Sequence, residues 1–120
     1  MKKKIFVFGS NLEGRHGKGA ALEARQKWGA VYGQAIGLQG NSYAIPTKET
    51  PYKSLPLDKI HGFVIQFCNF AYENPMLQFI LTPIGCGLAG YTPEQIAPMF
   101  DLAPGNVVLP SEFEDYLKEI

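Results

Sequence analysis

The glycines of this chain fall into two clusters, and this distribution constrains the fold more than any other feature of the sequence. Of the 13 glycines, eight lie within residues 9–40 and three within residues 85–90. Glycine is favoured where a backbone must adopt a positive φ or approach another group closely. Each cluster follows a short apolar run, KIFVF at 4–8 or LQFILT at 77–82, that is typical of a buried strand. The pattern predicts two strands that each end in a specialised loop, although ordinary turns would explain any single glycine.

A helix is expected after each of these loops. Residues 19–28 place two alanines and Trp28 on one face and end before Gly29, a typical helix stop. After the second loop, TPEQ at 92–95 supplies a capping residue, a proline at the first helical position and a glutamine that closes a capping box. Pro98 predicts that this second helix is short or kinked.

The remaining segments add two strands and two helices. Strands are predicted at 42–46 (SYAIP) and 107–109. Ser54 is expected to cap a helix with Pro56 in its first turn, and Ser111 to cap a final helix together with Glu114. The apolar stripes of these helices are Ile60, Phe63, Val64 and Phe67 in the first, and Phe113, Tyr116, Leu117 and Ile120 in the second.

This alternation of strands and helices predicts the fold class. Strands that alternate with helices form a parallel or mixed sheet with helices on both faces, which is an α/β fold. The length of 120 residues fits one domain, 1–120, and the sequence contains no repeat or linker.

Composition and charge exclude several classes of protein. A hydrophobic fraction of 46% excludes a disordered chain, and no apolar run is long enough to span a membrane. Eleven basic and eleven acidic residues cancel, which argues against a broad surface for duplex nucleic acid. Cys68 and Cys86 form neither a disulfide framework nor a metal-ligand spacing, so we expect no metal and no cofactor. These features, with no signal-peptide pattern after Met1, predict a soluble cytoplasmic protein.

The first glycine loop has phosphate-loop spacing without phosphate-loop chemistry. Gly9 and Gly14 are spaced as in a P-loop, but Arg15 and His16 stand where such a loop needs Lys and Ser or Thr. The dinucleotide fingerprint is also absent after the first strand. What remains is a strand, a glycine loop and a helix, whose backbone N–H groups can hold a phosphate at the positive end of the helix.

The second glycine loop, residues 83–90, repeats this arrangement of strand, loop and helix. In a parallel sheet both loops would open at the same carboxyl edge, where such folds bind ligands. Two facing glycine loops would suit a diphosphate. The expected ligand-binding residues are Gly14, Gly17, Lys18 and Gly19 in the first loop, and Ile84, Gly85, Cys86, Gly87, Leu88, Gly90 and Tyr91 around the second. Tight turns without a ligand are the alternative.

Two stretches, VFGSNLEGRHGKGAALEARQKWGA and TPIGCGLAGYTPEQIAPMF, resemble the macro domain, an ADP-ribose-binding module. The subgroup most similar to this chain is the terminal ADP-ribose protein glycohydrolase type. Lys27-Trp28-Gly29-Ala30 is similar to that subgroup's Lys-Phe-Gly-Gly, Thr47-Lys48 matches its Thr-Lys, and residues 83–88 nearly match its P-x-I-G-C-G-L. The resemblance covers residues 4–109 and implies a minimal macro-like three-layer α/β/α sandwich that binds ADP-ribose or an ADP-ribosylated macromolecule.

The sequence also departs from this family. The family's usual first strand ends in Gly-Asp, whose acid binds adenine, and it has no counterpart ahead of residue 4. In the glycohydrolase subgroup the lysine of Thr-Lys is the nucleophile, which implies that role for Lys48. The aspartate that assists it follows G-C-G-L, where this chain has Ala89. The resemblance therefore leaves binding and catalysis as competing expectations.

Other polar residues have two readings each. Asn11 matches a family position that contacts the distal ribose, and Asn is also a common turn residue. His16 is a candidate for phosphate contact or proton transfer, or an exposed loop histidine. Glu94 and His61 are expected to be structural or surface residues, and Cys86 a small packed residue rather than a nucleophile.

Three functions follow from these observations. The first is binding of ADP-ribose or a related phosphorylated nucleoside through the two glycine loops. The second is a hydrolase that removes ADP-ribose or processes a derivative of it, with Lys48, Asn11 and His16 as the candidate catalytic residues. The third is an unrelated Rossmann-like nucleotide-binding protein.

Overall fold

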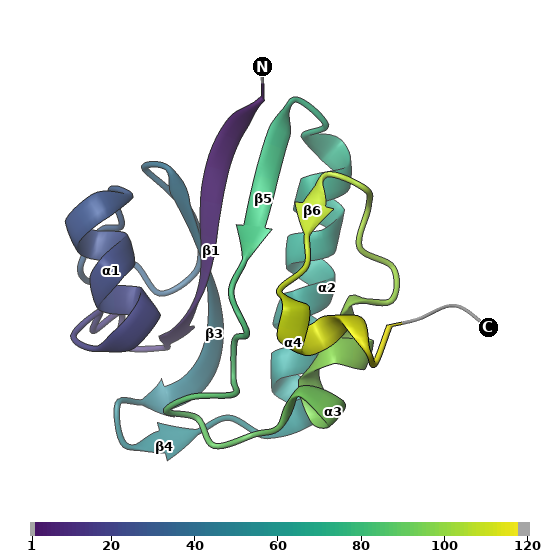
Figure 1. The fold of residues 1–120 in the computed structure, drawn as a ribbon. Helices are drawn as coiled ribbons and strands as arrows, with labels where there is room; N and C mark the ends of the chain where they lie inside the picture. Colours follow the sequence, from purple (N-terminus) through teal and green to yellow (C-terminus); the bar gives the residue numbers. More distant parts are fainter. Residues whose placement is uncertain (1, 118–120) are drawn as a thin grey trace.

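The computed structural model describes residues 2–117, which form one mixed β-sheet with helices on both faces (Figure 1). The strands are β1 (Lys3–Asn11), β2 (Gly37–Gln39), β3 (Ser42–Thr50), β4 (Lys53–Ser54), β5 (Leu77–Leu81) and β6 (Val107–Val108). The helices are α1 (Gly19–Lys27), α2 (Leu57–Glu73), α3 (Pro93–Ile96), the 3-10 turn η1 (Ala97–Phe100) and α4 (Ser111–Glu114). The strand order across the sheet is β2-β3-β1-β5-β6, and β4 pairs with the end of β3.

Strand β1 lies at the centre of the sheet and is apolar on both faces. Ile5 and Val7 are buried on one face, and Phe6 and Phe8 on the other. The strand pairs in parallel with β3 and β5, and β5 pairs in parallel with β6, whereas β2 and β4 run antiparallel to β3. The predicted α/β fold with a mixed central sheet is therefore confirmed.

The two faces of β1 belong to two separate cores. Helix α1 covers the smaller core, where Ala21 and Ala24 pack near Phe6 and the Trp28 ring stacks on Phe6 with centroids 5.2 Å apart. Helices α2, α3 and α4 cover the larger core on the opposite face (Figure 1). Its centre is Phe67, whose ring contacts those of Tyr43 and Phe79 at 5.0 and 5.3 Å. The result is three layers, with α1 as one outer layer.

The strands are longer or shorter than the sequence patterns indicated. The strand predicted at 4–8 extends to Asn11, and the strand predicted at 42–46 extends to Thr50, so Asn11 and Lys48 lie on strands rather than after them. The strands predicted at 77–82 and 107–109 are each one residue shorter. Parallel pairing with β1 holds the second half of β3 extended, and a single sequence does not reveal that partner.

Helix starts were predicted correctly in two cases and wrongly in two. The helix predicted at 19–28 begins at Gly19 as expected and ends one residue earlier, at Lys27. The Thr92–Gln95 capping box is present, and the helix ends quickly in the turn η1 that contains Pro98. Ser54 does not cap α2; it lies in β4, and the N-cap of α2 is Pro56. Ser111 is the first residue of α4 rather than its cap. Ser54 instead uses its hydroxyl to donate a hydrogen bond to Ala89 O at 2.6 Å, a tertiary contact.

The predicted apolar stripes agree better with the structure. Ile60, Val64 and Phe67 are fully buried, and Phe63 packs against the same core. In the C-terminal segment Phe113 is buried in α4, which already ends at Glu114. Beyond that helix Leu117 packs on the core, but Tyr116 is 47% exposed. Ile120 lies outside the described residues. Within residues 2–117, no helix combines the length and apolar character that a membrane span needs.

The packing around Phe67 gives the first prediction. Replacing Phe67 with Ala should lower the free energy of unfolding by about 3–5 kcal/mol, because it removes a buried ring and leaves a cavity. Urea unfolding measured by circular dichroism tests this. Ile65→Ala is the matched control on the same helix, because Ile65 is 49% exposed and its loss should cost much less. Equal losses for the two variants would contradict the assigned core.

Candidate functional site

A cavity of about 580 Å³ opens at the carboxyl ends of the three central parallel strands. It is lined by Gly9, Ser10 and Asn11 from β1, by Thr47 and Lys48 from β3, and by Thr82 and Pro83 just after β5. This edge of an α/β sheet is the usual position for ligands. The volume lies within the range of about 300–1,000 Å³ that is typical of small-molecule sites.

The first glycine loop and the start of α1 form one wall of the cavity. Gly17, Lys18 and Gly19 line it, followed by Ala20 and Ala21 of the first helical turn. The N-cap residue Lys18 makes no side-chain capping bond, and the first turn holds no acidic residue. The first N–H groups of a helix have no partner within the helix and attract anions. This wall therefore presents free N–H groups and the positive end of the helix.

The second glycine loop forms the opposite wall. Gly85, Cys86, Gly87, Leu88 and Ala89 all line the cavity. Hydrogen bonds within the loop fix its shape: Cys86 N donates to Pro83 O, and Gly90 N donates to Gly87 O. Across residues 2–117, no group accepts a hydrogen bond from the N–H of Gly87, Leu88 or Ala89. Those amides are free to bind a ligand or water.

The charged residues that line the cavity in the described part of the chain are all positive. Arg15, Lys18 and Lys48 line it, and no Asp or Glu is among its lining residues in the described part of the chain. Lys48 Nζ donates a hydrogen bond to Pro51 O, which orients the amine along the β3–β4 turn. Arg15 also pairs with Glu13 at 3.1 Å, but both side chains are well exposed, so this ion pair contributes little. The arrangement favours an anionic ligand.

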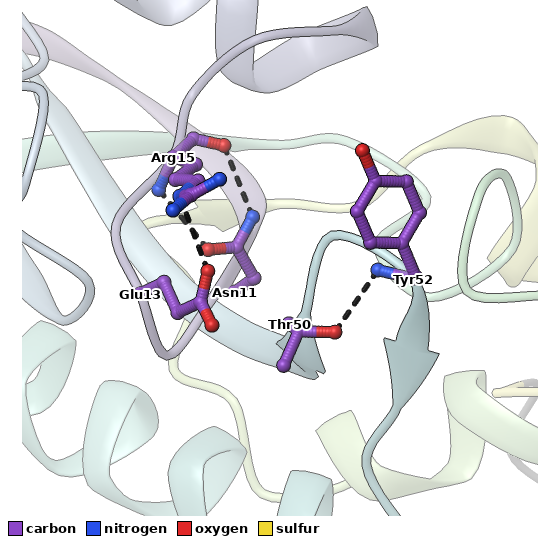
Figure 2. A network of polar contacts seen from close by, with 5 residues as sticks. All are labelled: Asn11, Glu13, Arg15, Thr50 and Tyr52. Carbon is purple, nitrogen blue, oxygen red and sulfur yellow. Dashed lines mark hydrogen bonds and ion pairs between the residues drawn. The ribbon is translucent and has the colours of Figure 1, made fainter.

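Asn11 holds the turn that brings Arg15 to the cavity (Figure 2). Its Oδ1 accepts a hydrogen bond from Arg15 N, and its Nδ2 donates one to Arg15 O, both at 3.0 Å. An amide group has two donor hydrogens and two acceptor lone pairs, so each atom keeps one free site. Asn11 is 7% exposed and lines the cavity. Asn11 therefore stabilises the turn and can still form a hydrogen bond to a ligand.

His16 is not at the cavity, which corrects both sequence-based readings of this residue. Its side chain is fully buried, and its ring packs edge-on against Phe8 with centroids 5.2 Å apart. Nε2 lies 3.0 Å from Gln34 O and 3.2 Å from Gln39 Oε1, and Oε1 also accepts a hydrogen bond from Val31 N. Two acceptors at Nε2 place the ring proton there. The loop turns His16 inward, so it neither contacts a ligand in the cavity nor lies in solvent.

Three further residues expected to bind ligand support the loops instead. Gly14 has a φ of +71°, and a Cβ added there would lie 2.4 Å from the carbonyl carbon of Gly33, so Gly14 serves a close backbone contact. Gly90 has a φ of +86° and forms a turn. Tyr91 donates from its hydroxyl to Leu55 O at 2.6 Å, which fastens the second loop to the chain before α2. None of the three lines the cavity.

Conversely, the cavity includes residues that the sequence analysis did not select. Arg15, Tyr32 and Tyr52 line it, although they come from three different segments. The hairpin turn between β3 and β4 places Tyr52, and the sequence TPYK at 50–53 carried a turn signal that could have indicated this hairpin. His61 and Glu94 are exposed surface residues away from the cavity.

The cysteines differ in position and share a raised pKa. Cys86 lines the cavity, and burial, followed by the negative charge of Glu112, raises the pKa of its thiol. Cys68 is buried in the larger core, where burial raises its pKa to about 11. A thiol with a raised pKa is a poor nucleophile near neutral pH. This agrees with the expectation that Cys86 is a packed residue. No cluster of metal-binding side chains occurs in residues 2–117.

Comparisons with protein-family models, with curated proteins and with solved structures found no match to this chain.

The raised pKa of Cys86 predicts slow alkylation. At pH 7.5 iodoacetamide should modify Cys86 in the folded protein more slowly than in the urea-unfolded chain, because less thiolate is present. The rate should rise with pH as the thiolate fraction increases. Mass spectrometry of timed samples measures this, and Cys86→Ser provides the background rate of Cys68. Equal rates in folded and unfolded protein at pH 7.5 would contradict the assignment.

Proposed function

We propose that the cavity binds ADP-ribose or a related phosphorylated nucleoside, with the diphosphate between the two glycine loops. The observation that carries this proposal is the convergence of two loops with free N–H groups on one cavity whose charged lining residues are Arg15, Lys18 and Lys48. A diphosphate carries two negative charges and several acceptor oxygens, and backbone N–H groups with cations satisfy both. The resemblance to the macro domain supports the same ligand.

Several details support a diphosphate over a single phosphate. The two walls come from separate segments, residues 17–21 and 85–89, so a ligand between them meets N–H groups from both sides. The cavity volume of about 580 Å³ exceeds what one phosphate needs.

Both cysteines are free thiols, which agrees with the proposed cytoplasmic location.

The second candidate function is removal of ADP-ribose from a modified macromolecule with Lys48 as nucleophile. Its support is the position of Lys48 on the cavity wall. A lysine attacks a sugar carbon only as the neutral amine, which needs a nearby base or a suitable environment. Ala89 stands where the subgroup has its aspartate, and no described residue supplies a carboxylate to the cavity. Binding without turnover is therefore the better supported function.

An unrelated Rossmann-like nucleotide-binding protein is the third candidate. It would use the same loops for phosphate, but it would bind common nucleotides at least as well as ADP-ribose. A thermal-shift series with ADP-ribose, ADP, AMP and adenosine separates these candidates.

We expect ADP-ribose to stabilise the protein more than adenosine does, because the proposed contacts are mainly to phosphate. At 100 times its Kd a ligand adds about 2.7 kcal/mol to the free energy of unfolding, and the resulting rise in Tm is readily measured. Equal shifts for ADP-ribose and adenosine, or none for either, would contradict the diphosphate site.

Gly87→Val provides a sharp control for this experiment. Gly87 lines the cavity, has no positive φ, and an added Cβ would meet nothing within 4 Å, so the variant should fold and lose the shift. Gly85 is less suitable because it is buried with a φ of +75°, and its Cβ would lie 3.0 Å from Ile96 Cδ1. Gly105→Val is the matched surface control, since Gly105 also has open space around it and lies outside the cavity.

Lys48→Ala tests the two leading functions against each other. For a binding protein, Lys48→Ala should weaken ADP-ribose binding by about 1.5–3 kcal/mol at most, the value of one charge-assisted hydrogen bond, with no release of ADP-ribose by either form. For a lysine-dependent hydrolase, the wild type should release ADP-ribose from a modified protein and borohydride should trap the sugar on it.

The second variant in this test is Ala89→Asp, which restores the acid of the family pattern and should raise activity if Lys48 is a nucleophile. Chromatography of the released ADP-ribose measures all four forms: wild type, both single variants and the double variant. Strong wild-type hydrolysis that survives Lys48→Ala would contradict both accounts and direct attention to Asn11.

A further inference from the structure

We propose that Tyr52 stacks on the base of the bound ligand and makes the site selective for compounds that carry an aromatic base. This inference rests on the proposed function, because it assigns the base-binding part of the same site. The family pattern would hold adenine through an acid at the end of an additional strand, and no Asp or Glu lines this cavity among the described residues. Another group must therefore hold the base.

The first observation is the unusual exposure of Tyr52 at the rim of the cavity. Its side chain is 92% exposed, yet it is one of the lining residues. Figure 2 shows the ring on the opposite side of the view from Asn11 and Arg15, which line the same cavity. Covering an exposed aromatic ring with a flat apolar surface lowers the free energy of the complex.

The second observation is that the turn bearing Tyr52 is held in place. Tyr52 N donates a hydrogen bond to Thr50 Oγ1 at 3.1 Å, and Lys48 Nζ donates one to Pro51 O. The following residues pair with β3, and the Ser54 hydroxyl connects β4 to the second glycine loop. A ring on a fixed turn loses less entropy on binding than a ring on a mobile one. The backbone that carries the exposed Tyr52 ring is therefore held beside the cavity.

The third observation separates Tyr52 from the other aromatic residue at the cavity. Tyr32 is already engaged, because the Arg25 guanidinium lies over its ring at 5.3 Å and the His16 ring lies edge-on at 6.4 Å. Across residues 2–117, no ring or cation is in stacking contact with Tyr52. Tyr52 thus offers the free aromatic face next to the phosphate-binding loops.

Stacking also determines which bases the site should accept. Every base has a π-face, so stacking tolerates a change of base, whereas recognition by hydrogen bonds does not. With no carboxylate at the cavity to accept from the adenine amino group, the site should accept hypoxanthine in place of adenine. We expect inosine diphosphate ribose to bind within about threefold of ADP-ribose.

The test is calorimetric titration of ADP-ribose into wild type, Tyr52→Phe, Tyr52→Leu and Tyr72→Ala. Tyr52→Leu should weaken binding by about ten- to a hundredfold, the loss typical of removing one base–aromatic stack. Tyr52→Phe keeps the ring and should bind within about threefold of wild type. Tyr72→Ala is the matched control, since Tyr72 is 77% exposed on α2 and lies outside the cavity.

A second readout reports stacking directly. Proton NMR of bound ADP-ribose should show upfield shifts of adenine H2 and H8 that Tyr52→Leu removes. If Tyr52→Leu binds ADP-ribose as tightly as wild type does, this inference is overturned and the proposed function stays intact. No binding of ADP-ribose by wild type would overturn the proposed function itself. A loss of binding in Tyr52→Phe equal to that in Tyr52→Leu would assign the effect to the hydroxyl and also overturn the stacking role.

Discussion

The parallel pairing of β1 with β3 on one side and β5 on the other is the interaction on which the site depends. The register sets Phe8 beside Ala44 and Val7 beside both Tyr43 and Leu81, so the three strands end at one edge. Because the strands run in the same direction, the loops that follow β1 and β5 emerge together, although some 70 residues separate them in the sequence. Without this pairing the two glycine loops would not share a cavity.

The glycines divide into two physical roles that their clustering conceals. Gly17, Gly19, Gly85 and Gly87 line the cavity, where the lack of a side chain leaves backbone N–H groups accessible. Others allow two backbone segments to touch: a Cβ on Gly40 would lie 2.5 Å from Gly29 O, as one on Gly14 would collide with Gly33. The Gly14–Gly33 contact holds the segment after α1 against the first loop, and the Gly29–Gly40 contact holds the end of α1 against the turn between β2 and β3. The loop geometry at the cavity depends on glycines that never meet the ligand.

The polar residues show a similar division between binding and support. His16 combined a loop position with chemistry suited to phosphate, yet the structure buries it among Phe8, Gln34 and Gln39. Ser54 was a reasonable helix cap, yet its hydroxyl holds Ala89 in the second loop. In both cases the sequence showed a polar side chain that needs a hydrogen-bond partner. The partner itself lies far away in the sequence, so the sequence did not identify it. Support of this kind positions Lys48, Tyr52 and the second loop around one opening.

The sequence by itself determined the α/β class, most strands and helices, the Thr92–Gln95 cap and the two glycine loops, because periodicity, capping and glycine usage act over a few residues. It also indicated most of the cavity lining around residues 17–19 and 84–88. Only the tertiary structure decided that His16 is buried, that Gly14 and Tyr91 are supports, and that Tyr32 and Tyr52 reach the cavity. Those outcomes depend on strand pairing and on contacts between segments far apart in the chain, and local patterns carry no record of such partners.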